Sequence, residues 1–101
     1  MSRNQFVLDG EIISLDTLRH TPAGIPSLSL TLRHESQQEE AGKAAAAQFD
    51  MNAVAFGEIA AEMAKTGVRT GQRISVKGFM NRKNRFSEFP VLHITQFKLQ
   101  D

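Results

Sequence analysis

The sequence predicts a mainly β fold, in which five short strands form a Greek-key barrel and one short helix lies between the third and fourth strands. Apolar and polar residues alternate with a period of two in several short runs, which is typical of half-buried strands. A single helical pattern interrupts these runs. The 101 residues are enough for one modest core, and we expect residues 1–101 to form a single domain.

The alternation is clearest in residues 27–36, where Leu28, Leu30 and Leu32 alternate with polar residues. Gly10 lies inside the first expected strand, and a glycine at such a position often marks a sharp bend. A bend there suits a first strand that pairs on both sides of a barrel. The five expected strands are residues 5–15, 27–36, 48–56, 71–80 and 89–99.

The expected helix covers residues 57–67, where Ile59 and Met63 are four residues apart and glycines stand at both ends. Residues 21–26 form a turn cluster, and we expect residues 37–47 to form a mobile hairpin loop. Five strands with a helix between the third and fourth are the layout of the OB-fold. Five-stranded barrels of the SH3 type are the alternative, but they usually lack that helix.

Several classes of protein are disfavoured by composition. The chain has no cysteine, which excludes disulfides and thiolate chemistry and fits a reducing compartment. No apolar run approaches membrane-spanning length, and the N-terminus becomes polar too early for a signal peptide. We therefore expect a cytoplasmic protein without membrane association.

The net charge of +1 conceals a strong segregation of charge along the chain. Residues 1–64 hold four cations and nine acids, whereas residues 65–85 hold seven cations and no acid. Such a local concentration of positive charge favours a polyanionic ligand more than the net charge suggests.

The cations between the last two expected strands indicate a phosphate-binding surface. Arg82, Lys83 and Arg85 fall in that loop, and Lys77 lies on the polar face of the preceding strand. Loops at this place in OB-folds commonly contact single-stranded nucleic acid, and Phe86 could stack on a base. The competing interpretation is a solvated loop that happens to be basic, but the absence of acids over residues 65–85 favours binding.

Other phenylalanines are expected in the core. Phe79, Phe89 and Phe97 alternate with apolar residues, as core residues do. Because the chain has no Trp and no Tyr, few rings remain for stacking, and we expect electrostatics to dominate binding.

No catalytic or metal-binding pattern is present in the sequence. The three histidines lack the spacing of metal ligands, and the acidic pairs have neither an apolar pocket nor a nucleophile beside them. No glycine pattern matches a nucleotide-binding loop. We therefore expect no enzyme, no metal and no cofactor.

Residues 21–42, TPAGIPSLSLTLRHESQQEEAG, carry motifs that resemble a known family. They are P-x-G-I-P, a strand ending in L-x-H and Q-E-E-A-G, followed by V-x-G-F at 76–79 and V-L-H at 91–93. Together they resemble the bacterial primosomal replication protein N (PriB) family, which is related to the single-stranded DNA-binding proteins. The resemblance covers essentially the whole chain.

This resemblance implies an OB-fold homodimer that binds single-stranded DNA. It also implies a role in restarting stalled replication forks, in which the restart helicase PriA is bound and stimulated and other primosome proteins are recruited. Arg19 matches a basic residue that the family carries before P-x-G-I-P, and Arg82, Lys83 and Arg85 match its basic loop.

The chain departs from the family after Q-E-E-A-G. Lys43, alanines and Gln48 stand where aromatic rings are expected, and Glu35 stands where some members carry a cation. We therefore expect weaker binding of single strands than in relatives that carry those rings, with partner contacts bearing more of the function. The candidate nucleic-acid-binding residues are Arg19, Arg33, His34, Lys43, Lys77, Arg82, Lys83, Arg85 and Phe86.

A second functional hypothesis is a protein-interaction adaptor, whose basic loops meet an acidic protein surface and whose nucleic-acid binding is residual. An RNA-binding domain of the cold-shock type is disfavoured, because such domains carry dense aromatic runs on adjacent strands.

Overall fold

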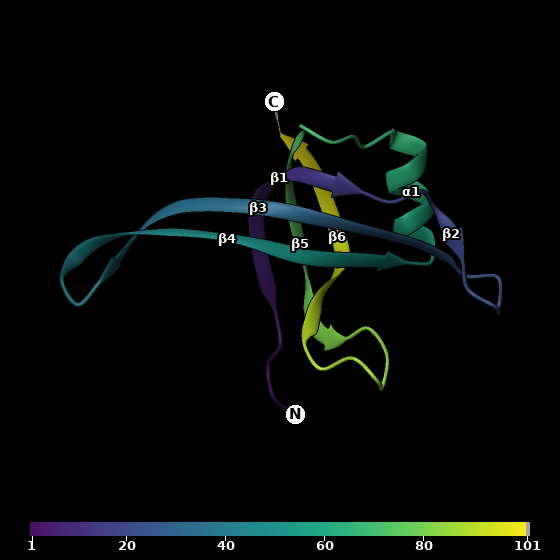
Figure 1. Ribbon diagram of the computed structural model, residues 1–101, viewed down its shortest axis with the longest axis horizontal. Coiled ribbons are helices and arrows are strands. Elements are labelled where there is room, and N and C mark those ends of the chain that lie inside the picture. Colours follow the sequence, from purple (N-terminus) through teal and green to yellow (C-terminus); the bar gives the residue numbers. More distant parts are fainter. Residues whose placement is uncertain (101) are drawn as a thin grey trace.

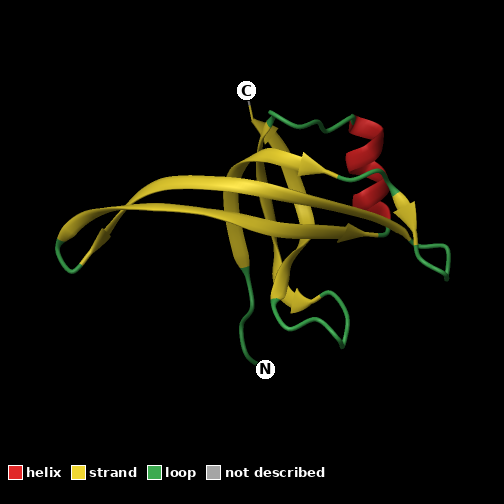
Figure 2. Cartoon of the chain, viewed as in Figure 1, coloured by secondary structure: helices red, strands yellow, loops and turns green. Residues whose placement is uncertain are grey.

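The computed structural model describes residues 1–100. Its elements are β1 (Phe6–Leu15), β2 (Arg19–His20), β3 (Pro26–Glu40), β4 (Lys43–Phe56), α1 (Glu58–Thr66), β5 (Arg73–Arg82) and β6 (Pro90–Gln100). Five long strands, with the helix between the third and fourth of them, confirm the predicted OB-fold (Figures 1 and 2). The two-residue strand β2 pairs with the start of β3 and was not predicted from the sequence.

Strand β1 closes the barrel because it pairs on both sides. From Phe6 to Glu11 it pairs antiparallel with β5, and from Glu11 to Leu15 it pairs antiparallel with β3. The circle continues from β5 to β6, then through a short parallel pairing to β4, and back to β3. The predicted bend at Gly10 lies at this change of partner. A β carbon at Gly10 would lie 2.9 Å from the Arg33 carbonyl oxygen, so the close approach of β1 to β3 requires glycine.

The core is formed by the inward faces of the strands and closed at one end by α1. Ala60 and Met63 are the buried residues of the helix. The helix ends at Gly67, whose φ of 80° is left-handed and whose N–H donates to the carbonyl oxygens of Met63 and Ala64. The other buried apolar residues are Ile12, Leu28, Leu30, Leu32, Ala53, Val54, Ala55, Val68, Ile74, Val76, Leu92 and Ile94.

Strands β3 and β4 form a long hairpin, so the expectation of a mobile loop over residues 37–47 was wrong. The strands remain paired as far as Glu40 opposite Lys43. Only Ala41 and Gly42 form the turn, and their φ angles of 54° and 76° are those of a type I′ turn. This turn matches the twist of the two strands, which explains why the pairing continues to the tip.

The outer part of this hairpin, residues 35–48, forms an arm. It projects from the barrel in Figure 1 and contributes to a long dimension of 49 Å, against 35 and 22 Å for the other two axes. None of its side chains is fully buried. Its stability therefore rests on its backbone ladder and on its continuity with the barrel, since an isolated two-stranded ribbon is only marginally stable.

Residues 1–100 contain neither a membrane-spanning helix nor a cluster of metal ligands. No helix there is long and apolar enough to cross a membrane. No group of three or more His, Asp or Glu side chains in that range is placed to hold a metal ion.

Candidate nucleic-acid interface

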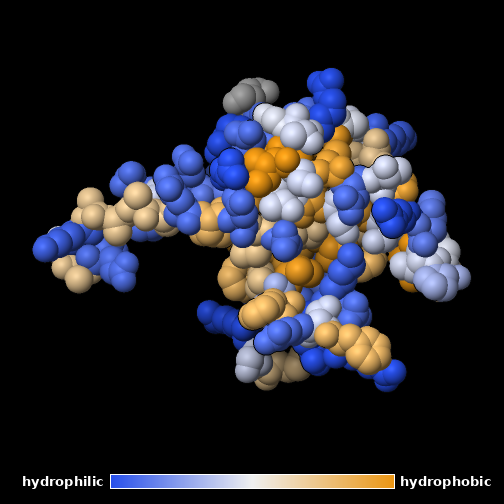
Figure 3. Space-filling view, viewed as in Figure 1, coloured by the Kyte–Doolittle hydropathy of each residue, from blue (hydrophilic) through white to orange (hydrophobic). Residues whose placement is uncertain are grey.

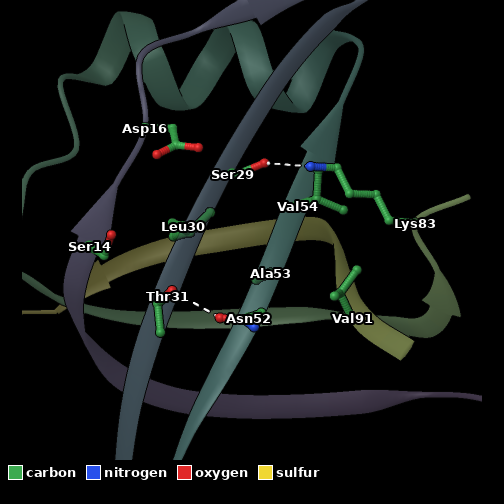
Figure 4. Close-up of a pocket in the computed structure, with 10 residues that line it drawn as sticks. All are labelled: Ser14, Asp16, Ser29, Leu30, Thr31, Asn52, Ala53, Val54, Lys83 and Val91. Atoms are coloured by element: carbon green, nitrogen blue, oxygen red, sulfur yellow. Dashed lines mark hydrogen bonds between the residues drawn. The ribbon is translucent and has the colours of Figure 1, made fainter. Parts of the chain in front are cut away.

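A cleft of about 290 Å³ lies on the outer face of β3 and β4, where the Lys83 side chain extends from the loop between β5 and β6 toward Ser29 of β3 (Figure 4). The face of these two strands and the loops around it hold oligonucleotides in many OB-folds. Apolar atoms of Leu30, Val54 and Val91 contribute to the lining. Its polar side chains are Ser14, Asp16, Ser29, Thr31, Asn52 and Lys83.

The β5–β6 loop, residues 83–89, is held in shape by Asn84. The Asn84 side-chain oxygen accepts hydrogen bonds from the Phe86 N–H at 2.9 Å and from the Ser87 hydroxyl at 3.2 Å. The Ser87 N–H also donates to the Asn84 carbonyl oxygen at 3.1 Å. These local bonds order the loop while its charged side chains stay exposed to solvent.

Three of the predicted cations come together in and beside this loop. Lys83 extends its ammonium group to 3.4 Å from the Ser29 hydroxyl, which ties the loop to β3 (Figure 4). The Arg82 guanidinium donates to the Arg85 carbonyl oxygen at 3.5 Å. Within residues 1–100 the single ion pair is elsewhere, so these three cations are free to bind phosphates.

Two aromatic rings of the loop are exposed beside these cations. Phe86 is 82% exposed and Phe89 is 73% exposed. The Arg85 guanidinium carbon lies 4.8 Å from the centre of the Phe86 ring. Figure 3 has the orientation of Figure 1, and at the bottom, where the β5–β6 loop lies, hydrophobic and hydrophilic residues are mixed on the surface. Exposed rings next to cations are the combination that single-strand-binding surfaces use.

The expectation that Phe89 belongs to the core was therefore wrong. Strand β6 begins only at Pro90, so Phe89 precedes the alternation that would have buried it. Phe79 is also 37% exposed, with its ring stacked on His93 at 5.0 Å between centroids. Phe97 packs against the core as expected.

Arg33 and His34 have partners inside the molecule. The Arg33 Nε donates to the Asp50 carboxylate at 3.1 Å, and this hydrogen bond raises the pKa of Arg33 above its ordinary value. The His34 ring is hydrogen-bonded to the Asp9 carbonyl oxygen at 2.6 Å and to the Ser36 hydroxyl at 2.8 Å. Both residues thus hold the base of the arm, and neither is as free as the loop cations.

The remaining predicted residues lie apart from the loop. Arg19 is in β2, and Lys43 is at the tip of the arm opposite Glu40. Lys77 lies in β5 and lines a different cleft, together with Ser75 and Lys98 among others. These three cations do not join the cluster of Arg82, Lys83 and Arg85.

Freeing Arg33 is expected to strengthen the binding of a polyanion. The Asp50→Ala variant removes one acid from the outer face of β4 and releases the Arg33 guanidinium. One additional phosphate contact steepens the salt dependence of single-strand binding by about 0.7 in log–log slope. Fluorescence anisotropy at several salt concentrations measures this change, and an unchanged affinity at low salt would contradict it.

The polar side chains at the base of the cleft were not predicted from the sequence. Ser29 and Thr31 are two of the polar residues that alternate with Leu28, Leu30 and Leu32, and the alternation alone indicates no role for them. The Thr31 hydroxyl donates to the Asn52 side-chain oxygen at 3.0 Å because the two residues are opposite each other in the hairpin. A hairpin register counted back from the Ala41–Gly42 turn would have paired them. Nothing in the sequence indicated that Asp16 lies beside Ser29.

Comparison with known proteins identifies the family of the chain. The model of a family described as another single-strand binding protein family matches residues 4–96. Replication restart protein PriB of Nitrosomonas europaea is 34% identical over 99 residues, covering 98% of this chain and 90% of the relative. The same protein of Neisseria gonorrhoeae is 41% identical over 81 residues, covering 80% of this chain and 78% of the relative.

Solved structures show the same fold. The PriB structure from Ralstonia solanacearum superposes with a TM-score of 0.83 at 25% identity, covering 98% of this chain and all of that one (100%). The single-stranded DNA binding protein from Thermus aquaticus gives a TM-score of 0.75 at 23% identity, covering 98% of this chain and 50% of that one. From the family match and the relatives that share a third or more of its residues, the chain belongs to the replication restart protein PriB family, within the single-strand binding proteins.

Proposed function

We propose that the chain binds single-stranded DNA and serves as an accessory protein of the replication restart primosome, where it binds and stimulates the restart helicase PriA at stalled forks. The observation that carries the proposal is the β5–β6 loop together with the end of β5. There, three cations that form no ion pair within residues 1–100 and two exposed rings adjoin a cleft with polar side chains. Membership of the PriB family supports it, since the curated relatives are named replication restart proteins.

In the proposed mode of binding, the protein contacts the phosphates and the bases of the DNA with different residues. Arg82, Lys83 and Arg85 neutralise phosphates, which provides affinity independent of sequence. Phe86 and Phe89 offer flat faces on which unpaired bases stack. Because bases in a duplex are already stacked and paired, the rings favour single strands over duplex.

Removing the two rings is expected to weaken single-strand binding selectively. Stacking contributes about 1–3 kcal/mol per base, so the double variant Phe86→Ala, Phe89→Ala should lose about ten-fold or more in affinity for a single strand. Its salt dependence should stay close to that of the unaltered chain, because no cation is removed. Ile25→Ala, which truncates another exposed apolar side chain, is the matched control. An equal loss on single-stranded and duplex DNA would contradict a stacking role.

The arm contributes no aromatic ring between Lys43 and Ala47. The expectation of weaker single-strand binding than in relatives with rings at those positions therefore stays a prediction. In the proposed mode, Phe86 and Phe89 of the β5–β6 loop provide the stacking instead. Titrating a single strand with this chain and with a relative that carries rings in the arm, at the same salt concentration, compares their affinities.

A homodimer is part of the proposal, and the free edge of β1 supports it. Within residues 1–100, residues 6–8 pair with β5 on one side and with no strand on the other, and Phe6 and Val7 on this edge are 46% and 67% exposed. An open apolar edge of this kind favours pairing with a second copy across a two-fold axis. Light scattering should give about twice the mass of one chain, and the Val7→Lys variant should have the mass of a single chain. A single-chain mass before mutation would contradict the dimer.

An adaptor role is the second candidate, and the charge of the arm favours it. Glu35, Glu39 and Glu40 are all exposed there, and they repel a DNA backbone but suit a basic protein surface. Unwinding of a forked substrate by PriA, measured with and without the chain, tests both roles. Stimulation that is lost together with single-strand binding supports the first proposal. Stimulation that survives the loss of DNA binding supports the adaptor, and no stimulation contradicts both.

A further inference from the structure

The cleft on β3 and β4 contains a carboxylate that phosphate binding does not explain. Asp16 follows β1, and its N–H donates to the Ser29 carbonyl oxygen at 2.9 Å, which fixes its backbone beside β3. Ser29 also accepts from the Lys83 ammonium, so Ser29 stands between the acid and the cation, as Figure 4 shows. A surface built only to follow phosphates would gain nothing from an acid at this place, because the two negative charges repel.

The Asp16 carboxylate is also available to a ligand. Among residues 1–100 it forms no ion pair and no side-chain hydrogen bond. The Thr31 hydroxyl donates to the Asn52 side-chain oxygen, and this bond does not use the two hydrogens of the Asn52 amide, which can donate to a ligand. The cleft therefore offers an acceptor at Asp16, donors at Lys83 and Asn52, and hydroxyls that can serve as either.

The shape and lining of the cleft fit a base better than a phosphate. Four apolar residues, Leu30, Ala53, Val54 and Val91, line the cleft together with its polar side chains (Figure 4). A nucleobase has flat apolar faces and a polar edge, whereas a phosphate is polar on every side. The volume of about 290 Å³ is at the lower end of the range for small-ligand sites, which suits one nucleotide.

We propose that this cleft receives one unstacked base of the bound strand and reads its edge, with Asp16 accepting a hydrogen bond from an exocyclic amine. This inference rests on the proposed binding of single-stranded DNA. Cytosine offers an amine donor next to a ring acceptor, and Asp is a suitable acceptor for that amine. Thymine presents a carbonyl oxygen at the same position, which the carboxylate repels. The chain therefore prefers cytosine to thymine, although its phosphate contacts are indifferent to sequence.

Competition between oligo-dC and oligo-dT of equal length tests this preference. Both are pyrimidine strands with the same number of phosphates, so their main difference is the base edge. The unaltered chain should bind oligo-dC about five-fold more tightly, the lower end of what one base-specific contact provides. Asp16→Ala should abolish this preference by weakening oligo-dC binding relative to oligo-dT. Since the Asp16 side chain is exposed, the substitution should leave the thermal unfolding of the protein unchanged.

Asp50→Ala is the matched control, because it removes one acid from β4 without altering a residue of the cleft. It should raise the affinity for both oligonucleotides equally and keep their ratio. Equal affinity of the unaltered chain for the two strands would overturn the inference and leave single-strand binding intact. So would an equal gain for both strands in Asp16→Ala, since Asp16 would then act only by repulsion. Failure to bind either strand would overturn the inference together with the proposed function.

Discussion

Reversing the charge of the β5–β6 loop is expected to abolish the binding of single-stranded DNA. The variant replaces Arg82, Lys83 and Arg85 together by glutamate. These residues are exposed, and within residues 1–100 none of them forms an ion pair that would be lost. The fold should therefore persist while the charge of the proposed binding surface changes sign, which makes this the largest expected effect on function.

The salt dependence separates lost contacts from simple repulsion. Each phosphate contact contributes about 0.7 to the log–log slope of single-strand binding, so replacing the three cations by alanine should lower the slope by about 2. The glutamate variant should show no measurable binding at a salt concentration where the alanine variant still binds weakly. Anisotropy of a labelled oligonucleotide over a range of salt measures both.

A matched control removes the same charge elsewhere. Lys65, Arg69 and Arg73 lie in α1, in the loop after it and at the start of β5, and none of them lines the cleft. Their triple alanine variant should lose only the small affinity that follows from net charge. If this control were as defective as the loop variant, or if the loop variant still bound normally, the loop could not be the binding surface.

The substitution Gly78→Ala is expected to have the largest effect on stability. Gly78 lies in β5 between β1 and β6, next to a register shift in the β5–β6 pairing. A β carbon there would lie 1.8 Å from the His93 carbonyl oxygen and 2.8 Å from the His93 carbonyl carbon. Both are backbone atoms of the neighbouring strand, so no side-chain rotation can relieve the overlap.

The strands must separate or shift to accommodate this methyl group. Overpacking in a core removes about 1–3 kcal/mol, and a clash with backbone on this scale should remove about 3 kcal/mol or more from the free energy of unfolding. For a domain of this size the melting temperature should fall by at least about 12 °C. Thermal unfolding followed by circular dichroism measures the change.

Gly24→Ala is the control for the loss of glycine alone. A β carbon at Gly24 meets no atom within 4 Å, although its φ of 83° is left-handed. This substitution should therefore remove only about 1 kcal/mol, through backbone strain. A Gly78→Ala protein as stable as the Gly24→Ala protein would contradict the packing of β5 against β6.

The barrel was predictable from the sequence because its signals are local. Leu28, Leu30 and Leu32 alternate with polar residues because only one face of their strand is buried, and all three leucines are buried as predicted. Gly10 signalled a bend, which occurs where β1 changes partner. Each of these features depends on a few neighbouring residues.

The arm was not predictable in the same way. Type I′ turns usually carry Asn-Gly or Gly-Gly, whereas this one carries Ala41 in a left-handed conformation that alanine seldom adopts. The four alanines that follow have no β pattern and also weakened the strand signal. The pairing extends beyond the core because the strands are already aligned inside the barrel, and the sequence of the arm alone does not show this.

The candidate site was partly predictable. Charge segregation indicated the loop cluster of Arg82, Lys83 and Arg85, which the structure brings together. The cleft was not predictable, because Asp16 and Lys83, which both contact Ser29, are far apart in the sequence. Such a juxtaposition depends on barrel closure and not on spacing along the sequence.

The most direct test of this account is the affinity of the chain for a single strand of about 30 nucleotides and for its duplex, measured by anisotropy over a range of salt. We expect clear binding of the single strand, a steep decrease in affinity as salt rises, and weaker binding of the duplex because its bases cannot stack on Phe86 and Phe89. Equal binding of both forms, or no binding of the single strand at low salt, would contradict it.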